Sequence, residues 1–345
     1  MSLPLLPVNE KEEGRFYMKM ERAIALFLDY CRSKELRPKT MHSYEQALRL
    51  FTIWMQEEEG IEEVEQVQEM TVRSYILSLQ SRGKYAVTTN PAADSINHPA
   101  KRTDYLEKIT STTINNYLRN MNVFFKWLEE IEYLPKSPMR RVRLLPDKRK
   151  AREYLNDEEV KALINALDKS IYAEYRDRLV AMLMLDAGTR LGETLSIEMD
   201  EIDLVERSIR LPAEKTKGRR TRRVFFSMKL AVELRRWVYY KDVRCDSQFL
   251  FPVQRTGYRL KVSNYEANFR KYLQRCGIEK RISPHTFRNN FAKRCLMAGM
   301  DIYTLSRILG HSSVKVTERA YLDITDADLK EKYAKFSPIE QIYNK

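Results

Sequence analysis

The chain has 345 residues, 43% hydrophobic and 32% charged, so it is a globular protein long enough for two domains and neither disordered nor fibrous. Its four cysteines are far apart and form no C-x-x-C pair, which argues against a zinc finger or a disulfide framework, and no apolar run is long enough to span a membrane. These features indicate a soluble protein of the reducing cytoplasm. The formal net charge of +13 favours a polyanionic partner, although a merely lysine-rich surface is the plainer alternative.

The first third of the chain predicts a compact bundle of four or more helices. Helical stretches are expected around residues 18–34 and over 71–80. Two further helices, "KTMHSYEQALRLFTIWM" and "STTINNYLRNMNVFFKWLEE", carry Met and aromatic residues at helical spacing, and Thr40 is the expected N-cap of the first. Before the last helix, residues 83–102 hold two prolines and a glycine, which predicts a long, mobile connection.

Residues 134–153, "LPKSPMRRVRLLPDKRKARE", predict a boundary between two domains. Three prolines prevent a continuous helix, and eight basic residues stand against two acidic ones. A solvated linker has this composition, but so does a strap that crosses a phosphate backbone.

The second domain is expected to be mostly helical with a small sheet. Asn156 and Glu159 have the spacing of a capping box, and the apolar helix "RLVAMLMLDAG" is expected to end at Gly188. "RSIRLPAEKTKGRRTRRVFFS" alternates at both ends around a basic centre, which predicts a hairpin or a sheet edge. The helices "HTFRNNFAKRCLMAGM" and "DIYTLSRILG" follow, and the fold class is therefore mainly α.

Four polar segments of this domain are candidates for chemistry. They are "AGTRLGE", the basic turn "KTKGRRTRR", "HTFR" and "LGHSSVKVTERAY". Each alone has a structural explanation, since an arginine after a helix end caps carbonyls and a lone histidine is more often a satisfied structural residue. Together they provide two arginines, a lysine, two histidines and a tyrosine, which is a set suited to attack on a phosphodiester.

The chemistry of a phosphodiester explains why these residue types suit it. Guanidinium groups can clamp the non-bridging oxygens and stabilise the charge that grows in the transition state. Histidines can donate hydrogen bonds or move protons, a tyrosine can act as the covalent nucleophile, and a lysine can protonate the leaving alkoxide. No metal or other cofactor is required.

The order of these segments resembles the signature of the tyrosine recombinase, or phage integrase, family. The resemblance is sharpest over residues 150–325, and the N-terminal bundle is similar to the core-binding domain of two-domain members of the Xer and Cre kind. It implies an N-terminal core-binding clamp at 1–135, a basic linker at 136–153, a catalytic domain at 154–328 and a C-terminal tail at 329–345. The catalytic domain would be mostly helical, with a small hairpin or a three-stranded sheet.

The resemblance also assigns roles to residues. Arg190 and Arg288 resemble the two phosphate-clamping arginines, and His285 the motif histidine that assists proton transfer. His311 resembles the later residue that supports the scissile phosphate, and Tyr321 the nucleophile that forms a 3′-phosphotyrosine. The remaining assignments are Lys217 as general acid, with Lys215 as a rival, and Glu193 at the acidic position behind the site. Asn289 and Asn290 depart from the family pattern after "HTFR".

The implied activity is site-specific recombination of double-stranded DNA at paired inverted core sites, through a Holliday junction. The implied assembly is a homotetramer closed by exchange of the C-terminal tail, and a tail packed on its own domain is the alternative. The basic residues expected at the DNA backbone are Lys136, Arg140, Arg141, Arg143, Lys215, Arg219 and Arg220. Two other activities stay open, a type IB topoisomerase, which acts as a monomer, and a non-catalytic DNA-binding protein, which would have a damaged residue set.

Overall fold

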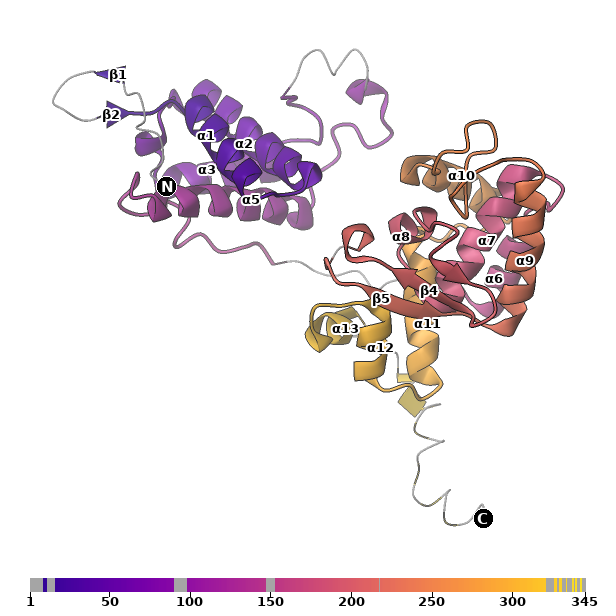
Figure 1. Cartoon of the computed structure of the whole chain (residues 1–345). Helices are drawn as coiled ribbons and strands as arrows, with labels where there is room; N and C mark the ends of the chain where they lie inside the picture. Colours follow the sequence, from indigo (N-terminus) through magenta and orange to yellow (C-terminus); the bar gives the residue numbers. More distant parts are fainter. Residues whose placement is uncertain are drawn as a thin grey trace. The chain divides into compact units, whose positions relative to one another are not determined.

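The protein is described by a computed structural model that covers residues 9–10, 16–89, 98–146, 153–216 and 218–320, with isolated positions between 326 and 342. The chain divides into two compact units, Met1–Arg149 and Lys150–Lys345, and the division falls inside the predicted linker (Figure 1). The prediction of a mainly helical chain with a small sheet is confirmed. No helix in the described ranges combines the length and the apolar character needed to cross a membrane.

The first unit is a helical bundle around an aromatic core. Its elements are β1 (Asn9–Glu10), β2 (Phe16–Tyr17), α1 (Met20–Ser33), α2 (Pro38–Glu59), η1 (Val64–Gln66), α3 (Glu69–Ser81), η2 (Pro99–Lys101) and α5 (Ser111–Glu130). Phe27, Phe51 and Phe124 are almost completely buried at its centre, and Phe27 meets Phe124 edge to face. The helices expected from the apolar spacing are therefore present, and they pack through those apolar faces.

The start of α2 differs from the prediction. The helix begins at Pro38, with Arg37 as its N-cap, so Thr40 lies inside the first turn and is not the cap. Proline suits the first helical position because its φ is already helical and its missing N–H would have no partner there. At α5 the expected kind of cap is present, since the side chain of Thr110 accepts a hydrogen bond from the amide of Thr113.

The two ends of the connection between α3 and α5 meet at its base, and its predicted mobility stays a prediction. Gly83 and Lys108 form an antiparallel bridge, and Lys84 Nζ lies 2.9 Å from a carboxylate oxygen of Glu107. A Cβ on Gly83 would lie 2.6 Å from the Cα of Leu106, so the close backbone approach requires glycine here. Residues 90–97 lie outside the described ranges.

The first half of the predicted linker belongs to the first unit. Met139 is buried in the aromatic core, and Val142 and Leu145 pack against it. The side chain of Asn115 on α5 exchanges two hydrogen bonds with the backbone of Leu145, at 2.9 and 2.8 Å. The basic side chains of this segment, Lys136, Arg140, Arg141 and Arg143, are exposed.

The second unit is built around α7. Its elements are α6 (Asp157–Asn165), α7 (Tyr172–Ala187), α8 (Leu191–Leu195), β3 (Ile202–Asp203), β4 (Ser208–Leu211), η3 (Ala213–Lys215), β5 (Arg222–Phe225), α9 (Met228–Asp242), α10 (Val262–Arg275), α11 (His285–Met297), α12 (Ile302–Leu309) and α13 (Val314–Ala320). α7 packs against α8, α9 and α11, so it is buried on several sides. α6 starts with the predicted capping box, in which Asn156 and Glu159 bond each other's amides.

The predicted hairpin is part of a three-stranded antiparallel sheet in the order β3-β4-β5. Ile209 of β4 faces Val224 of β5, and both are completely buried. The loop between these strands carries the basic turn, and β5 contacts α12, so the hairpin lies beside α12 and α13 (Figure 1). The sheet thus brings the basic turn close to the helix that ends just before His311.

Candidate active site

Arg190 is placed by a tight turn between α7 and α8. Gly188 ends α7 with a φ of +64°, and a Cβ at this position would lie 2.4 Å from the ring of Phe291 on α11. The turn leaves Arg190 as the N-cap residue of α8, one turn before Glu193. The Gly188 prediction is confirmed, and the reason is that helix α11 passes too closely for any side chain.

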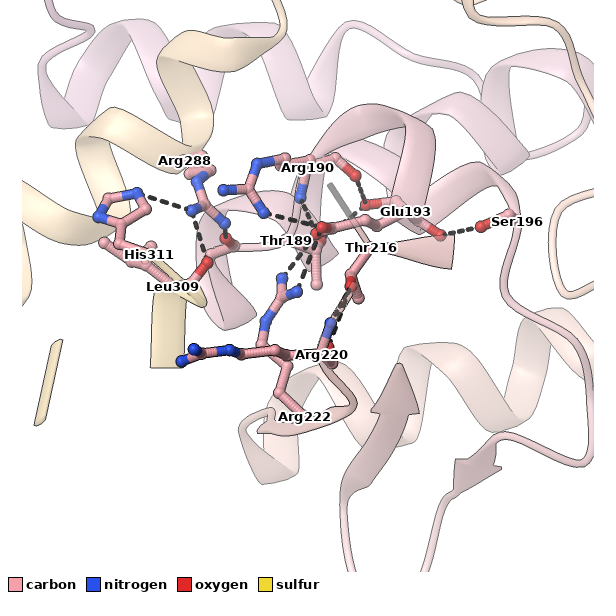
Figure 2. Close-up of polar contacts among 12 residues, drawn as sticks. Thr189, Arg190, Glu193, Ser196, Thr216, Arg220, Arg222, Arg288, Leu309 and His311 are labelled. Atoms are coloured by element: carbon pink, nitrogen blue, oxygen red, sulfur yellow. Dashed lines mark hydrogen bonds and ion pairs between the residues drawn. The ribbon is translucent and has the colours of Figure 1, made fainter. Parts of the chain in front are cut away.

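Glu193 holds two arginines at once. Its carboxylate accepts hydrogen bonds from the backbone N–H of Arg190 at 3.0 Å and from the Arg190 guanidinium at 2.8 Å. On the other side, Arg222 of β5 donates to both carboxylate oxygens, at 2.6 and 3.2 Å (Figure 2). Burial by itself would raise the pKa of Glu193, but the hydrogen bonds and charge of Arg222, together with those of Arg190, hold it below its usual value. Glu193 is therefore ionised and orients both guanidinium groups.

Arg288 lies at the first turn of α11 and is anchored by main-chain carbonyls. Its guanidinium donates to the carbonyl of Gly188 at 2.5 Å and to that of Leu309 at 2.7 Å. Only 6% of its surface is exposed. These two carbonyls terminate α7 and α12, so Arg288 joins the turn that carries Arg190 to the turn that carries His311.

His311 follows the left-handed Gly310, which ends α12 with a φ of +65°. Its Nε2 lies 3.1 Å from a guanidinium nitrogen of Arg288, and its Nδ1 lies 2.7 Å from the hydroxyl of Thr317 on α13. Arginine can only donate, so Nε2 is the acceptor and Nδ1–H donates to Thr317. The two contacts therefore fix the ring orientation and the tautomer.

Both histidines of the site are held neutral. Burial, followed by the charges of Arg288 and Arg190, lowers the pKa of His311 to about 4. Desolvation, followed by the charge of Arg288, also lowers the pKa of His285, the first residue of α11. His285 and Arg288 are three residues apart on α11 and so share one face of that helix, and the contact between Arg288 and His311 brings the second histidine to the same place.

The tip of the hairpin places the other basic residues. The hydroxyl of Thr216 donates to the carbonyl of Arg220 at 3.0 Å and accepts from its amide at 3.1 Å, which closes the turn. The side chains of Arg219 and Arg220 are exposed. Lys215 instead points to the carboxylates of Glu198 and Glu201, at 2.7 and 2.8 Å.

The engagement of Lys215 disfavours two of the roles predicted for it, as a phosphate contact and as the rival general acid. Burial by itself would lower the pKa of Lys215, but the bonds to Glu198 and Glu201 raise it, and an ammonium held this firmly is a poor proton donor. Lys217 and Tyr321 lie outside the described residues.

The structure thus brings together Arg190, Glu193, His285, Arg288 and His311, while Lys136, Arg140, Arg141 and Arg143 lie in the first unit. It also adds two residues that the sequence prediction missed, Arg222 and Thr317. Arg222 had a detectable signal, because it stands two positions before the buried Val224 on β5 and therefore faces inward. Thr317 had none, because its contact with His311 depends on how α13 folds back.

Among the described residues, no group of three or more His, Cys, Asp or Glu side chains could hold a metal ion. A cleft of about 700 Å³ runs beside the site between the hairpin and α12, lined by residues that include Gly218, Arg220, Arg222 and His311.

Comparison with protein-family models decides the family of the chain. The phage integrase family model matches residues 153–328, and the model of the phage integrase N-terminal SAM-like domain matches residues 24–93. The chain belongs to the phage integrase family. It is a tyrosine-type site-specific recombinase, a DNA strand transferase, and the prediction of this function is confirmed.

Relatives and solved structures agree with this assignment. This recombinase is 27% identical to the tyrosine recombinase XerD of Pseudomonas putida over 311 residues, which cover 88% of this chain and 93% of that one. It is 30% identical to XerC of Chlamydia muridarum over 220 residues, covering 61% and 68%.

Among solved structures, the Tn1549 transposon integrase in complex with transposon right end DNA has a TM-score of 0.68 at 15% identity and covers 93% of this chain and 100% of that one. The XerH site-specific recombinase bound to palindromic difH substrate has a TM-score of 0.63 at 16% identity, covering 91% and 85%. At these identities the structural likeness establishes the shared two-domain fold.

Proposed function

We propose that this recombinase cuts and rejoins double-stranded DNA through a 3′-phosphotyrosine intermediate on Tyr321. The observation that carries the proposal is the cluster of Arg190, Arg288 and His311, whose side chains are anchored by hydrogen bonds, with His285 one turn before Arg288 on α11. Solved structures of similar fold contain DNA, which supports duplex DNA as the partner. The complete set of residue types favours catalysis over binding alone.

In this mechanism the two arginines stabilise the charge on the scissile phosphate. The diester carries one negative charge and gains more in the transition state, and donors that are already oriented lose no free energy in reorganising at that moment. Arg288 is oriented by the carbonyls of Gly188 and Leu309, and Arg190 by Glu193. This is the preorganisation that the reaction requires.

The proposed chemical step has one bond made and one broken. The Tyr321 oxygen bonds to phosphorus as the bond from phosphorus to the 5′ oxygen breaks. His285, which is held neutral, takes the tyrosine proton, and Lys217 gives a proton to the leaving 5′ oxygen. His311 supports the phosphate, whose negative charge would raise its lowered pKa and favour a hydrogen bond from Nε2. Rejoining reverses these transfers with the 5′ hydroxyl of another strand.

We further propose how the protein grips and pairs its DNA sites. The exposed side chains of Lys136, Arg140, Arg141, Arg143, Arg219 and Arg220 would contact backbone phosphates. Residues 1–135 would act as the core-binding clamp, 136–153 as the linker, and 154–328 as the catalytic domain. Four copies on paired inverted core sites would exchange strands through a Holliday junction in the cytoplasm, with the tail at 329–345 docking on a neighbouring copy.

A suicide duplex with a nick near the cleavage site tests the chemical proposal. The wild-type protein should form a covalent protein–DNA complex, because the short 5′ fragment diffuses away and religation fails. Tyr321→Phe should bind the same DNA with unchanged affinity and form no covalent complex. A covalent complex with this variant would assign the reaction to another tyrosine, such as Tyr303, Tyr333 or Tyr343. A four-way junction from paired sites would separate recombination from relaxation of supercoils.

A further inference from the structure

Arg222 joins three separate parts of the candidate site. It lies on β5, and its guanidinium is bidentate to Glu193 next to Arg190. Its Nε donates to the carbonyl of Ile308 at 3.1 Å, in the last turn of α12. Its side chain is only 9% exposed, so these contacts are made away from bulk water.

A second observation shows how closely α12 approaches this side chain. A Cβ on Gly310 would lie 2.8 Å from Cδ of Arg222, 3.0 Å from its Nε and 3.1 Å from its Cζ. The residue after Gly310 is His311, so the turn that presents the histidine rests directly on the arginine. Figure 2 shows Arg222 between the strand and Glu193, on the opposite side of the carboxylate from Arg190.

We propose that Arg222 is a positioning residue for DNA cleavage, which neutralises Glu193 so that the positive charge of Arg190 remains available to the scissile phosphate, and which holds the His311 turn in register with the hairpin. The inference rests on the proposed function, because it concerns the same cluster.

The charges explain why the pairing matters. Arg190 and Arg222 share the one carboxylate of Glu193, so together they keep a net positive charge in the site. Without Arg222, Glu193 would be a buried carboxylate with 3% of its side chain exposed, and Arg190 would be the cation left to compensate it. The guanidinium of Arg190 would then be drawn from the phosphate toward Glu193. Loss of Arg222 would therefore resemble a partial loss of Arg190.

Two duplexes make this effect measurable, one with a normal scissile phosphate and one with an uncharged methylphosphonate. The methylphosphonate lacks the charge that Arg190 stabilises, so a variant with a diverted Arg190 should be slowed less on it. The quantity measured is the ratio of single-turnover cleavage rates on the two duplexes. Arg222→Gln should lower the cleavage rate of the phosphate duplex by roughly tenfold to a hundredfold. The ratio of the methylphosphonate rate to the phosphate rate should therefore rise by about tenfold or more. Arg190→Ala should shift it in the same direction.

Matched variants separate positioning from general damage to the fold. Arg223→Gln removes the same charge from the exposed face of the same strand and should leave the ratio unchanged. Glu193→Gln combined with Arg222→Gln removes the buried carboxylate too, so Arg190 is no longer diverted and the ratio should return toward the wild-type value. Arg222→Lys keeps the charge beside Glu193 and should give an intermediate ratio.

A melting curve of each variant shows whether it is folded. If Arg222→Gln alone does not fold, the double variant is measured in its place, because it has no unpaired buried carboxylate. A ratio in the double variant far from the wild-type value would overturn the proposal. Equal slowing of both duplexes by Arg222→Gln would also overturn it, because that is the result of a purely structural role. If Arg190→Ala shifts the ratio and Arg222→Gln does not, only the role of Arg222 fails. If the wild-type protein forms no covalent complex, the proposed function itself fails.

Discussion

The two units of this recombinase use charge in opposite ways. Among the described residues of the first unit, the buried polar side chains are Thr52, Thr71, Asn115 and Ser137, and all are uncharged. The second unit buries ionisable side chains, namely Glu174, Arg176, Asp177, Glu193, Glu201, Lys241 and Arg288. The first unit keeps its charge at the surface, and the second builds part of its interior from charge.

Exposed charges and buried charges suit different tasks, the first DNA binding and the second catalysis. Surface charges remain hydrated and screened by salt, so they attract a polyanion without a fixed geometry. Buried charges cost desolvation energy and persist only with partners in good geometry, which fixes their positions. Glu193 and Arg288 illustrate this, since each holds the turns around the site by two or more hydrogen bonds. We therefore expect substitution of exposed charges to change binding and substitution of the buried charges of the second unit to change rate.

The largest effect should come from Lys217→Ala. Loss of a general acid lowers a rate by roughly a hundredfold to ten-thousandfold. A substrate with sulfur in place of the bridging 5′ oxygen should restore cleavage, because a thiolate leaves without a proton. Cleavage of the two substrates in a single turnover is the measurement.

Lys215→Ala is the matched control for this prediction. It should lower the melting temperature, because the buried carboxylate of Glu201 would lose the cation that compensates its charge, and sulfur should not rescue any fall in rate. Rescue of Lys215→Ala and not of Lys217→Ala would reverse the two assignments.

Arg190→Ala and Arg288→Ala should each slow cleavage by about a hundredfold or more while DNA affinity changes little, since each removes one oriented donor. Arg220→Ala removes an exposed arginine near the same cleft and should affect affinity more than rate. Single-turnover cleavage beside a binding titration measures both quantities. An equal loss of rate and affinity in Arg190→Ala would make that arginine a backbone contact only.

The sequence predicted correctly several helices and helix starts that depend on residues close together in the chain. The helix 111–130 followed from apolar spacing, and the start of α6 followed from Asn156 and Glu159. Thr40 was wrong as a cap because Pro38, two residues earlier, is itself a good first residue of a helix. In these cases the determining residues lie within one helical turn of each other.

Contacts between distant segments were not predictable in the same way. The motif residues pointed to Arg190, Arg288 and His311, but not to Arg222 as the second partner of Glu193, 29 residues along the chain. The partners of Lys215 were also hidden, because Glu198 and Glu201 reach it only once β3 and β4 have paired. A basic turn in the sequence does not reveal which of its cations is already neutralised.

Replacing Arg140, Arg141 and Arg143 together with neutral residues tests whether the exposed charges of the first unit contribute to DNA affinity. Every phosphate that these side chains neutralise adds about 0.9 to the slope of log affinity against log salt, so the triple variant should have a flatter slope. Cleavage at saturating protein should stay close to that of the wild type. An unchanged slope would mean that these exposed arginines do not reach the DNA backbone.

The smallest effect expected is on the pH dependence of stability. His311 has a folded pKa of about 4, below its ordinary value, so the unfolded chain takes up a proton first as the pH falls. Its contribution to stability is therefore complete above the ordinary histidine value and is lost as the pH falls toward 4. His311→Gln should show a smaller fall in melting temperature between pH 7 and pH 4.5, by on the order of 2–4 °C. A fall as large as that of the wild type would assign the pH dependence to other groups.

Mapping the covalent attachment to a single residue tests the central claim most directly. Trypsin cuts after Arg319 and Lys330, and the resulting peptide 320–330 contains Tyr321 as its one tyrosine, whereas Tyr303, Tyr333 and Tyr343 fall in other peptides. The wild-type protein trapped on the suicide duplex, treated with nuclease and trypsin, should give this peptide with the mass of a 3′-linked nucleotide. The same nucleotide mass on the peptide of Tyr303, Tyr333 or Tyr343, with an unmodified peptide 320–330, would contradict the account.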